Sequence, residues 1–269
     1  MKFAAAQLNS HDDVTKNLAD VATVVARAKA EGAECVVLPE NFAFMGGTDE
    51  ERRTASEALD GDGPIVSTLR RLAREHGVTI VGGGFPERTG DPARPHNTAL
   101  VVAPSGDVVA AYRKIHLFDV DVSDGQTYRE SAAVTAGNTT VVVDIGGLRV
   151  GLSICYDLRF PELYRRLVAE GAEVLLVPAA FTLTTGKDHW HALLRARAIE
   201  NQCWVVAAAQ WGKHPKGRQT YGKSLVIDPW GDVVAQAEEG APTLALATLR
   251  KERVAEVRRA MPCGAHRRL

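Results

Sequence analysis

Several features that mark other classes of protein are scarce in this sequence. The 269 residues carry a formal net charge of -1, so composition gives no reason to expect binding to nucleic acid or to an anionic membrane. Aromatic residues make up only 6%, which also argues against a surface that stacks on bases. No apolar run approaches the length of a membrane span, and the start turns polar too soon for a signal peptide. We therefore expect a cytoplasmic protein.

Cysteine is scarce as well, and its four positions are widely scattered. They form no CxxC pair, which argues against a zinc site of the usual spacing. In a reducing compartment we expect free thiols. Cys35 and Cys203 lie within runs of Val and Ala that are typical of a buried core, and Cys263 lies in a basic tail. Cys155 differs from these three because it ends a predicted strand.

Apolar runs alternate with helical patterns along the chain, which predicts an α/β fold. The length permits a single domain over residues 1–269 with a large core. Helices are predicted at about 14–31, 64–76, from Pro161 onward, at 187–201 and in the basic tail. Strands are predicted at 3–8, 35–40, 78–84, 98–103, 108–114, 139–145, 148–155, 174–180, 203–210, within 224–237 and at 243–249. Residues 116–138 read as a long irregular loop, and such loops inside compact domains are usually functional or disordered.

The sequence also contains two pairs of similar segments, as an internal repeat would. EGAECVVLPE at 31–40 resembles EGAEVLLVPA at 170–179, and TALVVAPSGDVVA at 98–110 resembles KSLVIDPWGDVVA at 223–235. Chance use of common strand and turn residues is the alternative, but we favour a duplication. Two such halves would pack as two sheets face to face with helices outside, because the apolar strands suit sheets that are covered on both faces.

Cys155 and Glu40 are the first candidates for chemistry. Cys155 ends the strand LRVGLSIC and precedes a helix, and active sites of α/β proteins lie beyond the carboxyl ends of strands. A helix N-terminus nearby would lower the pKa of the thiol. Glu40 ends another apolar strand, where a buried carboxylate is costly unless it is paired or used. The alternatives are a buried core cysteine and a glutamate that is exposed or in a structural ion pair.

Other candidates are weaker when taken alone. Lys114 ends a strand in YRKIH, where basic residues are common, and Glu130 lies in the long loop. His116 could pair with Cys155 as a Cys–His dyad. The run VGGGF at 81–85 lacks the third glycine and the helix of a dinucleotide site, so we interpret it as a tightly packed strand end.

Taken together, these motifs resemble the nitrilase superfamily of carbon–nitrogen hydrolases. The resemblance is carried by LPEN around Glu40, YRKIHLFD around Lys114 and SICYDLRFPELYR around Cys155. It implies that Cys155 is the nucleophile, Glu40 the general base, Lys114 the electrostatic partner and Glu130 a second glutamate that orients Lys114. It also implies a four-layer α-β-β-α sandwich, homodimers with the tail at about 250–269 in the interface, and no metal or organic cofactor.

Longer stretches resemble one branch of that superfamily, the amidases that act on deaminated glutathione. These stretches include HLFDVDVSDGQTYRES, TYGKSLVIDPWG and RRAMPCGAHRR. The resemblance implies hydrolysis of a small carboxylated amide through a Cys thioester, with 2-oxoglutarate and cysteinylglycine as products. The alternatives are an ω-amidase on 2-oxoglutaramate, an N-carbamoyl amino acid hydrolase, and a catalytically silent scaffold.

Four further residues are expected to contact the substrate. The backbone N–H of Tyr156 is placed to stabilise an oxyanion, and Phe181 and Thr182 follow a strand as walls of the pocket. Arg159 could bind a substrate carboxylate through its planar guanidinium, although an ion pair with Glu162 is an equal alternative.

Overall fold

The protein is built on two six-stranded sheets. The computed structural model describes residues 1–46, 48–121 and 127–268. The first sheet has the order β16 (Thr243–Thr248), β1 (Lys2–Gln7), β2 (Cys35–Val37), β3 (Thr79–Glu87), β4 (His96–Val102), β5 (Val108–Arg113). The second has the order β15 (Val233–Gln236), β14 (Leu225–Ile227), β11 (Trp204–Ala207), β10 (Val174–Leu176), β9 (Leu148–Leu152), β8 (Val142–Ile145).

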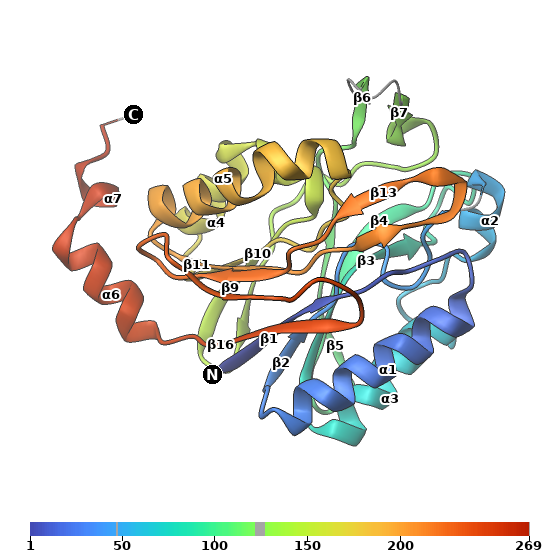
Figure 1. The fold of residues 1–269 in the computed structure, drawn as a ribbon, viewed down its shortest axis with the longest axis horizontal. Coiled ribbons are helices and arrows are strands. Elements are labelled where there is room, and N and C mark those ends of the chain that lie inside the picture. The colour runs from blue at the N-terminus through green and yellow to red at the C-terminus, as the bar shows by residue number, and fades with distance from the viewer. Residues whose placement is uncertain (47, 122–126, 269) are drawn as a thin grey trace.

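Helices cover the outer face of each sheet, so the chain forms the expected α-β-β-α layers (Figure 1). The first sheet carries α1 (Val14–Ala30) and α3 (Pro64–His76), and the second carries α4 (Pro161–Ala169) and α5 (Leu183–Asn201). The helix boundaries follow local signals. The Asp13 carboxylate accepts from the backbone N–H of Lys16 at the start of α1, and α3 begins with Pro64 and ends at Gly77 in the left-handed region.

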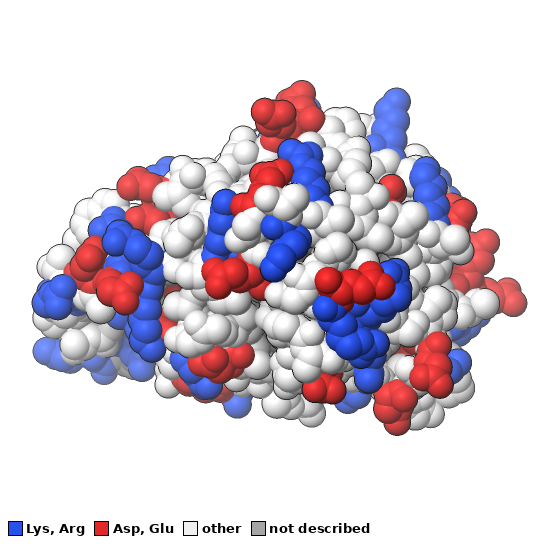
Figure 2. Space-filling view, turned by 90° about the horizontal axis from the view of Figure 1, so that it is seen from below, with Lys and Arg blue, Asp and Glu red and all other residues white. Residues whose placement is uncertain are grey.

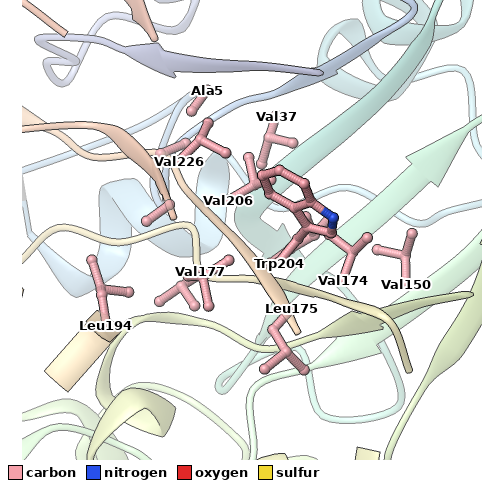
Figure 3. Packing of buried hydrophobic residues seen from close by; sticks show 14 of the residues in the cluster. Ala5, Val37, Val150, Val174, Leu175, Val177, Leu194, Trp204, Val206 and Val226 are labelled. Atoms are coloured by element: carbon pink, nitrogen blue, oxygen red, sulfur yellow. The ribbon is translucent and has the colours of Figure 1, made fainter. Parts of the chain in front are cut away.

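Alternating side chains give each sheet two buried faces. In β1, Phe3 and Ala5 join the core between the sheets, whereas Ala4 and Ala6 pack under α1 and α3. Figure 3 shows the same alternation in the second sheet: Val206 and Val226 lie near Ala5 and Val37, and Leu175, Val177 and Leu194 lie on the other side. The predicted continuous apolar strands are therefore explained by burial on both faces.

The two sheets share one topology, which agrees with the internal similarity of the sequence. In the first, β1, β2 and β3 are parallel, followed by antiparallel β4 and β5. In the second, β9, β10 and β11 are parallel, followed by antiparallel β14 and β15. The repeated segments form β2 and β10 and the hairpins β4–β5 and β14–β15. An antiparallel strand flanks β1 and β9 in each case, β16 and β8 respectively.

Three segments differ from the sequence-based expectations. The segment 116–138 is not irregular throughout, because β6 (Asp119–Asp121) pairs with β7 (Thr127–Arg129) and a short 3-10 helix η1 (Glu130–Ala132) follows; residues 122–126 lie outside the described part. The short helix α2 (Asp49–Thr54) and the hairpin β12 (Trp211–Lys213) with β13 (Gln219–Tyr221) were not predicted. The strands β2 and β10 are also shorter than the apolar runs that contain them.

The surface charges are mixed. On the face in Figure 2, acidic and basic side chains are interspersed, as expected from a formal net charge of -1. Among the described helices, none has the length and apolarity that a membrane crossing needs.

The basic tail forms α6 (Lys251–Ala260) and α7 (Cys263–His266), which extend away from the sandwich (Figure 1). The single domain and the dimer contact through this tail stay predictions.

Candidate active site

Three strand ends bring the predicted catalytic side chains together at one cavity. Glu40 follows β2, Lys114 follows β5, and Cys155 follows β9, and all three side chains line a single cavity of about 440 Å³ with Glu130. The first two come from one sheet and Cys155 from the other. The cavity therefore lies beyond the carboxyl ends of strands from both sheets, as expected for β2 and β9, which have parallel neighbours.

Lys114 is the centre of this cluster. Its Nζ donates to Glu40 Oε1 at 2.9 Å and to Glu130 Oε2 at 2.8 Å, and the side chain is buried. Burial opposes the ammonium charge, but the carboxylates of Glu130 and Glu40 outweigh it and raise the pKa of Lys114 above its ordinary value. Burial likewise opposes the charge on Glu130, yet Lys114 outweighs it and lowers the pKa of that carboxyl to about 2. Lys114 is therefore cationic at neutral pH.

The Glu40 carboxylate is held by donors from both sheets. Its Oε1 accepts from Lys114 and from Asn97 Nδ2 at 2.9 Å, and its Oε2 accepts from the backbone N–H of Ala180 at 3.0 Å. Its backbone carbonyl accepts from Gln210 Nε2 at 3.1 Å. These bonds fix the carboxylate in a buried position, and Cys155 lines the same cavity.

The glycine run 81–85 makes this placement possible. The residues lie within β3 at a bulge, and each of the three glycines lacks room for a side chain. A Cβ on Gly83 would lie 1.9 Å from the carbonyl oxygen of Leu38, and one on Gly84 would lie 2.7 Å from Asn97 Oδ1 and 3.3 Å from Glu40 Cγ. The tight packing predicted for this run is confirmed, but its interpretation as a strand end is wrong, because β3 continues to Glu87.

Cys155 occupies a strained turn between β9 and the 3-10 helix η2 (Cys155–Arg159). Its φ of 50° lies in the left-handed region, which is uncommon for a side chain other than glycine, and its N–H donates to the carbonyl of Pro178 at 2.9 Å. Tyr156, the next residue, opens the helical turn, where backbone N–H groups lack acceptors within the turn. The turn thus places both Cys155 and Tyr156 on the cavity wall.

The Cys155 thiol is neutral at rest. Burial is the main reason, and the neighbouring Glu40 carboxylate adds to it, so the pKa of Cys155 lies above its ordinary value. Lys114 and the N–H of Ala180 offset only part of this rise. The expectation that a helix N-terminus would lower the pKa of this thiol is therefore wrong, because the η2 turn separates Cys155 from α4 and burial dominates.

The four predicted substrate contacts all lie on the cavity wall: Tyr156, Arg159, Phe181 and Thr182. The Arg159 guanidinium lies over the rings of Phe181 and Tyr156, at 5.4 and 5.9 Å from their centroids, and approaches His189. The ion pairs found among the described residues do not include Arg159, so the alternative pairing with Glu162 is not observed.

His116 is not arranged as the base of a Cys–His dyad. Its Nδ1 contacts Asp157 Oδ1 at 2.7 Å, and its ring stacks on Phe160 at 3.7 Å. Asp157 also accepts from Tyr112 Oη and from the backbone N–H groups of His116 and Ile154. His116 is therefore part of a buried network that ties the nucleophile turn to the segment carrying Lys114.

Sequence reasoning missed Asn97, at the start of β4. Its Nδ2 donates to Glu40 Oε1 at 2.9 Å and to Glu130 Oε1 at 3.3 Å, and its backbone carbonyl accepts from the N–H of Lys114 at 2.9 Å. The only signal in the sequence is a polar residue beginning an apolar strand. Asn97 thus positions both glutamates relative to Lys114.

Replacing Asn97 with Leu should lower kcat about 10- to 100-fold, because two hydrogen bonds to charged carboxylates are lost. KM should change little, since Asn97 does not line the cavity. Steady-state kinetics would measure both. The matched control is Asn201→Leu, another buried asparagine that donates to Arg197 O; it should lower stability without this loss of kcat. An equal kcat in the two variants would contradict the role of Asn97.

No three His, Cys, Asp or Glu side chains in the described part of the chain cluster so as to hold a metal ion. The chemistry that the described cluster can support is attack by a thiol, with a carboxylate as proton acceptor and an ammonium as electrostatic partner.

Comparison with known proteins places this chain in a family. The carbon–nitrogen hydrolase family model matches residues 2–259. A deaminated glutathione amidase from Synechocystis is 48% identical over 98% of this chain and 97% of its own. The crystal structure of the Caenorhabditis elegans NitFhit protein superposes with a TM-score of 0.93 at 42% identity, over 99% of this chain and 65% of that one. Saccharomyces cerevisiae Nit3, a member of branch 10 of the nitrilase superfamily, gives 0.89 at 32% identity, over 100% and 97%. The chain therefore belongs to the carbon–nitrogen hydrolase family, as its three motifs predicted, and is an amidase within the nitrilase superfamily.

Proposed function

We propose that this protein hydrolyses the amide of deaminated glutathione, with Cys155 as nucleophile. The observation that carries the proposal is the buried Lys114 bonded to both Glu40 and Glu130 beside the thiol. The Synechocystis relative supports the choice of substrate, since it is named a deaminated glutathione amidase and aligns over nearly the whole chain. Arg159 supplies a cation for the 2-oxo carboxylate of the acyl group.

In the first half of the reaction, Glu40 accepts the proton of the Cys155 thiol while Sγ forms a bond to the amide carbon. The neutral resting thiol makes this transfer necessary, because little thiolate exists beforehand. The developing oxyanion is stabilised by Lys114 and the N–H of Tyr156. The C–N bond then breaks as Glu40 returns the proton to the leaving nitrogen, which gives cysteinylglycine and a thioester.

In the second half, Glu40 accepts a proton from water while the water oxygen attacks the thioester carbon. The C–S bond breaks, the proton returns to Sγ, and 2-oxoglutarate leaves. Glu130 and Asn97 keep Lys114 and Glu40 in place through both halves. In this proposal Glu40 takes the proton-accepting role that the imidazole has in Cys–His enzymes, and Lys114 stabilises the charges that form.

A substrate panel tests the proposal. Purified protein should release 2-oxoglutarate from deaminated glutathione faster than it acts on 2-oxoglutaramate, an N-carbamoyl amino acid or a nitrile. The measurement is product formation at equal subsaturating substrate concentration. Faster turnover of 2-oxoglutaramate or of the carbamoyl acid would change the substrate assignment but not the proposed mechanism. Turnover of the nitrile alone would contradict both the substrate assignment and the proposed amide hydrolysis.

A further inference from the structure

The cavity wall carries more positive charge than the catalytic cluster uses. Among its described lining residues, five are basic and three are acidic, an excess of two positive charges. Arg52, Lys114, Arg129, Arg159 and Arg218 supply the positive side, and Glu40, Asp49 and Glu130 the negative side. Arg129 is paired with Asp121, and Lys114 with Glu40 and Glu130. Among the described residues, Arg52, Arg159 and Arg218 form no ion pair, so two of them could hold the two carboxylates of one substrate, whereas 2-oxoglutaramate carries only one.

Arg52 is the cation whose donors are least used. Within the described residues, neither its Nε nor its Nη2 has a hydrogen-bond partner, although both atoms are buried. Leaving a buried donor unpaired is unfavourable, so these nitrogens favour an acceptor from a ligand. By contrast, Arg218 donates to the carbonyl of Ala180 and lies over the ring of Tyr128, and Arg159 approaches His189. Arg52 therefore lines the cavity with a guanidinium of which two nitrogens, Nε and Nη2, are unpaired.

The backbone of Arg52 is fixed by local structure. It lies on the short helix α2, which a capping box holds: the backbone N–H of Glu51 donates to Thr48 Oγ1 at 3.2 Å, and the backbone N–H of Thr48 donates to Glu51 Oε2 at 2.5 Å. Thr48 and Asp49 line the same cavity. The guanidinium is thus supplied by an ordered element and not by a freely rotating surface chain.

Arg52 belongs to the segment that follows Glu40, and Asn41, Met45 and Thr48 of the same segment also line the cavity. Burial is the largest influence on the pKa of Glu130 and opposes its charge. Lys114 lowers this pKa, and the charge of Arg52 lowers it further by a smaller amount. Glu130 flanks Lys114 together with Glu40, and Glu40 is the group that must protonate the leaving nitrogen. The leaving group therefore points toward the Glu40–Glu130 side, while Arg159 lies on the nucleophile turn and faces the acyl group.

We propose that Arg52 binds the carboxylate of the leaving group and so selects amides whose released amine carries a carboxylate. In deaminated glutathione this is the glycine carboxylate of cysteinylglycine. The inference rests on the proposed function and adds the determinant of leaving-group specificity. Arg159 and Arg52 then hold the two ends of one dianionic substrate, with the scissile amide between them.

The test compares three substrates that differ only on the leaving side: deaminated glutathione, its C-terminal glycinamide analogue, and 2-oxoglutaramate. Arg52→Gln should lower kcat/KM for deaminated glutathione about 10- to 100-fold, mainly through a higher KM, because hydrogen bonds to a charged group are lost. The other two substrates should change less than about threefold, since they lack the carboxylate. Arg52→Lys should fall between, because a point charge replaces the planar guanidinium.

The matched control is Arg53→Gln, which removes the exposed neighbouring arginine of the same helix and should leave all three substrates unaffected. Thermal unfolding of both variants checks that α2 is intact. An equal loss on all three substrates would overturn the inference, since Arg52 would then act through Glu130, and so would no loss on any. If wild type fails on deaminated glutathione while hydrolysing 2-oxoglutaramate, the proposed function fails instead.

Discussion

Cys155→Ala should reduce turnover of deaminated glutathione by at least about 10,000-fold, because the thioester can no longer form. The side chain is small and buried, so the alanine fits the turn and the fold should persist. The positive φ at this position is equally strained for both residues. The measurement is 2-oxoglutarate release by wild type and variant at matched protein concentration, with circular dichroism to confirm folding.

Two other cysteines provide the controls. Cys263→Ala removes the exposed thiol, and Cys203→Ala removes a buried one whose Sγ donates to Ala172 O at 3.3 Å. Both should keep turnover, although Cys203→Ala should lower the unfolding temperature, since it empties part of the core. If Cys155→Ala retained more than a hundredth of the wild-type rate, a different nucleophile would be required.

Lys114→Met should damage both activity and stability. Loss of one donor to the developing oxyanion costs about 100- to 1,000-fold in kcat, and the thiol also loses the cation that favours its ionisation. The variant leaves Glu40 and Glu130 buried without their shared ammonium. Removing one partner of a buried ion pair lowers the free energy of unfolding by about 3–5 kcal/mol. Kinetics and urea unfolding would measure the two effects separately.

The loss of stability should depend on pH in a defined direction. In wild type the pKa of Glu130 is lowered to about 2 from 4.5, so its contribution to stability is complete above pH 4.5 and is lost as pH falls toward 2. Without Lys114, burial opposes the charge of this carboxyl and only Arg52 and the N–H of Phe118 offset it, so we expect its pKa to rise and stability to be lost as pH rises. The deficit of the variant should therefore be larger at pH 8 than at pH 5.

The control for this second prediction is Lys251→Met. Lys251 is exposed and lies 3.4 Å from Glu173, so its loss should cost less than about 1 kcal/mol at either pH. An equal deficit of Lys114→Met at pH 5 and pH 8 would contradict the electrostatic account of the cluster.

The sequence predicted most of the fold because apolar pattern and helix signals are local. Helix α3 matches the predicted 64–76, since Pro64 and Gly77 bound an amphipathic run. Helix α2 was missed because DEERRT contains no apolar periodicity and is held by its cap. The hairpin β12–β13 was missed because Trp211 and Tyr221 are flanked by Gly, Lys and Gln, which do not alternate clearly.

Within the site, strand-end residues were predictable and long-range partners were not. Glu40, Lys114 and Cys155 each follow a strand, and the family resemblance supplied their roles. Asn97 and Arg52 became visible only when the fold brought them to Glu130, because neither has a local pattern that separates it from other polar residues. The neutral state of the Cys155 thiol also required the fold, since it depends on burial.

The pairing of β1 with β16 determines when the first sheet can be completed during synthesis. Lys2 pairs with Thr248 and Gln7 with Thr243, so one edge of β1 stays open until β16 has left the ribosome. Contacts this far apart in sequence form slowly, and an open strand edge is a template for association with other chains. Strand β16, which follows the other described strands in sequence, thus closes the edge of β1, and until it is in place that edge can pair with another chain.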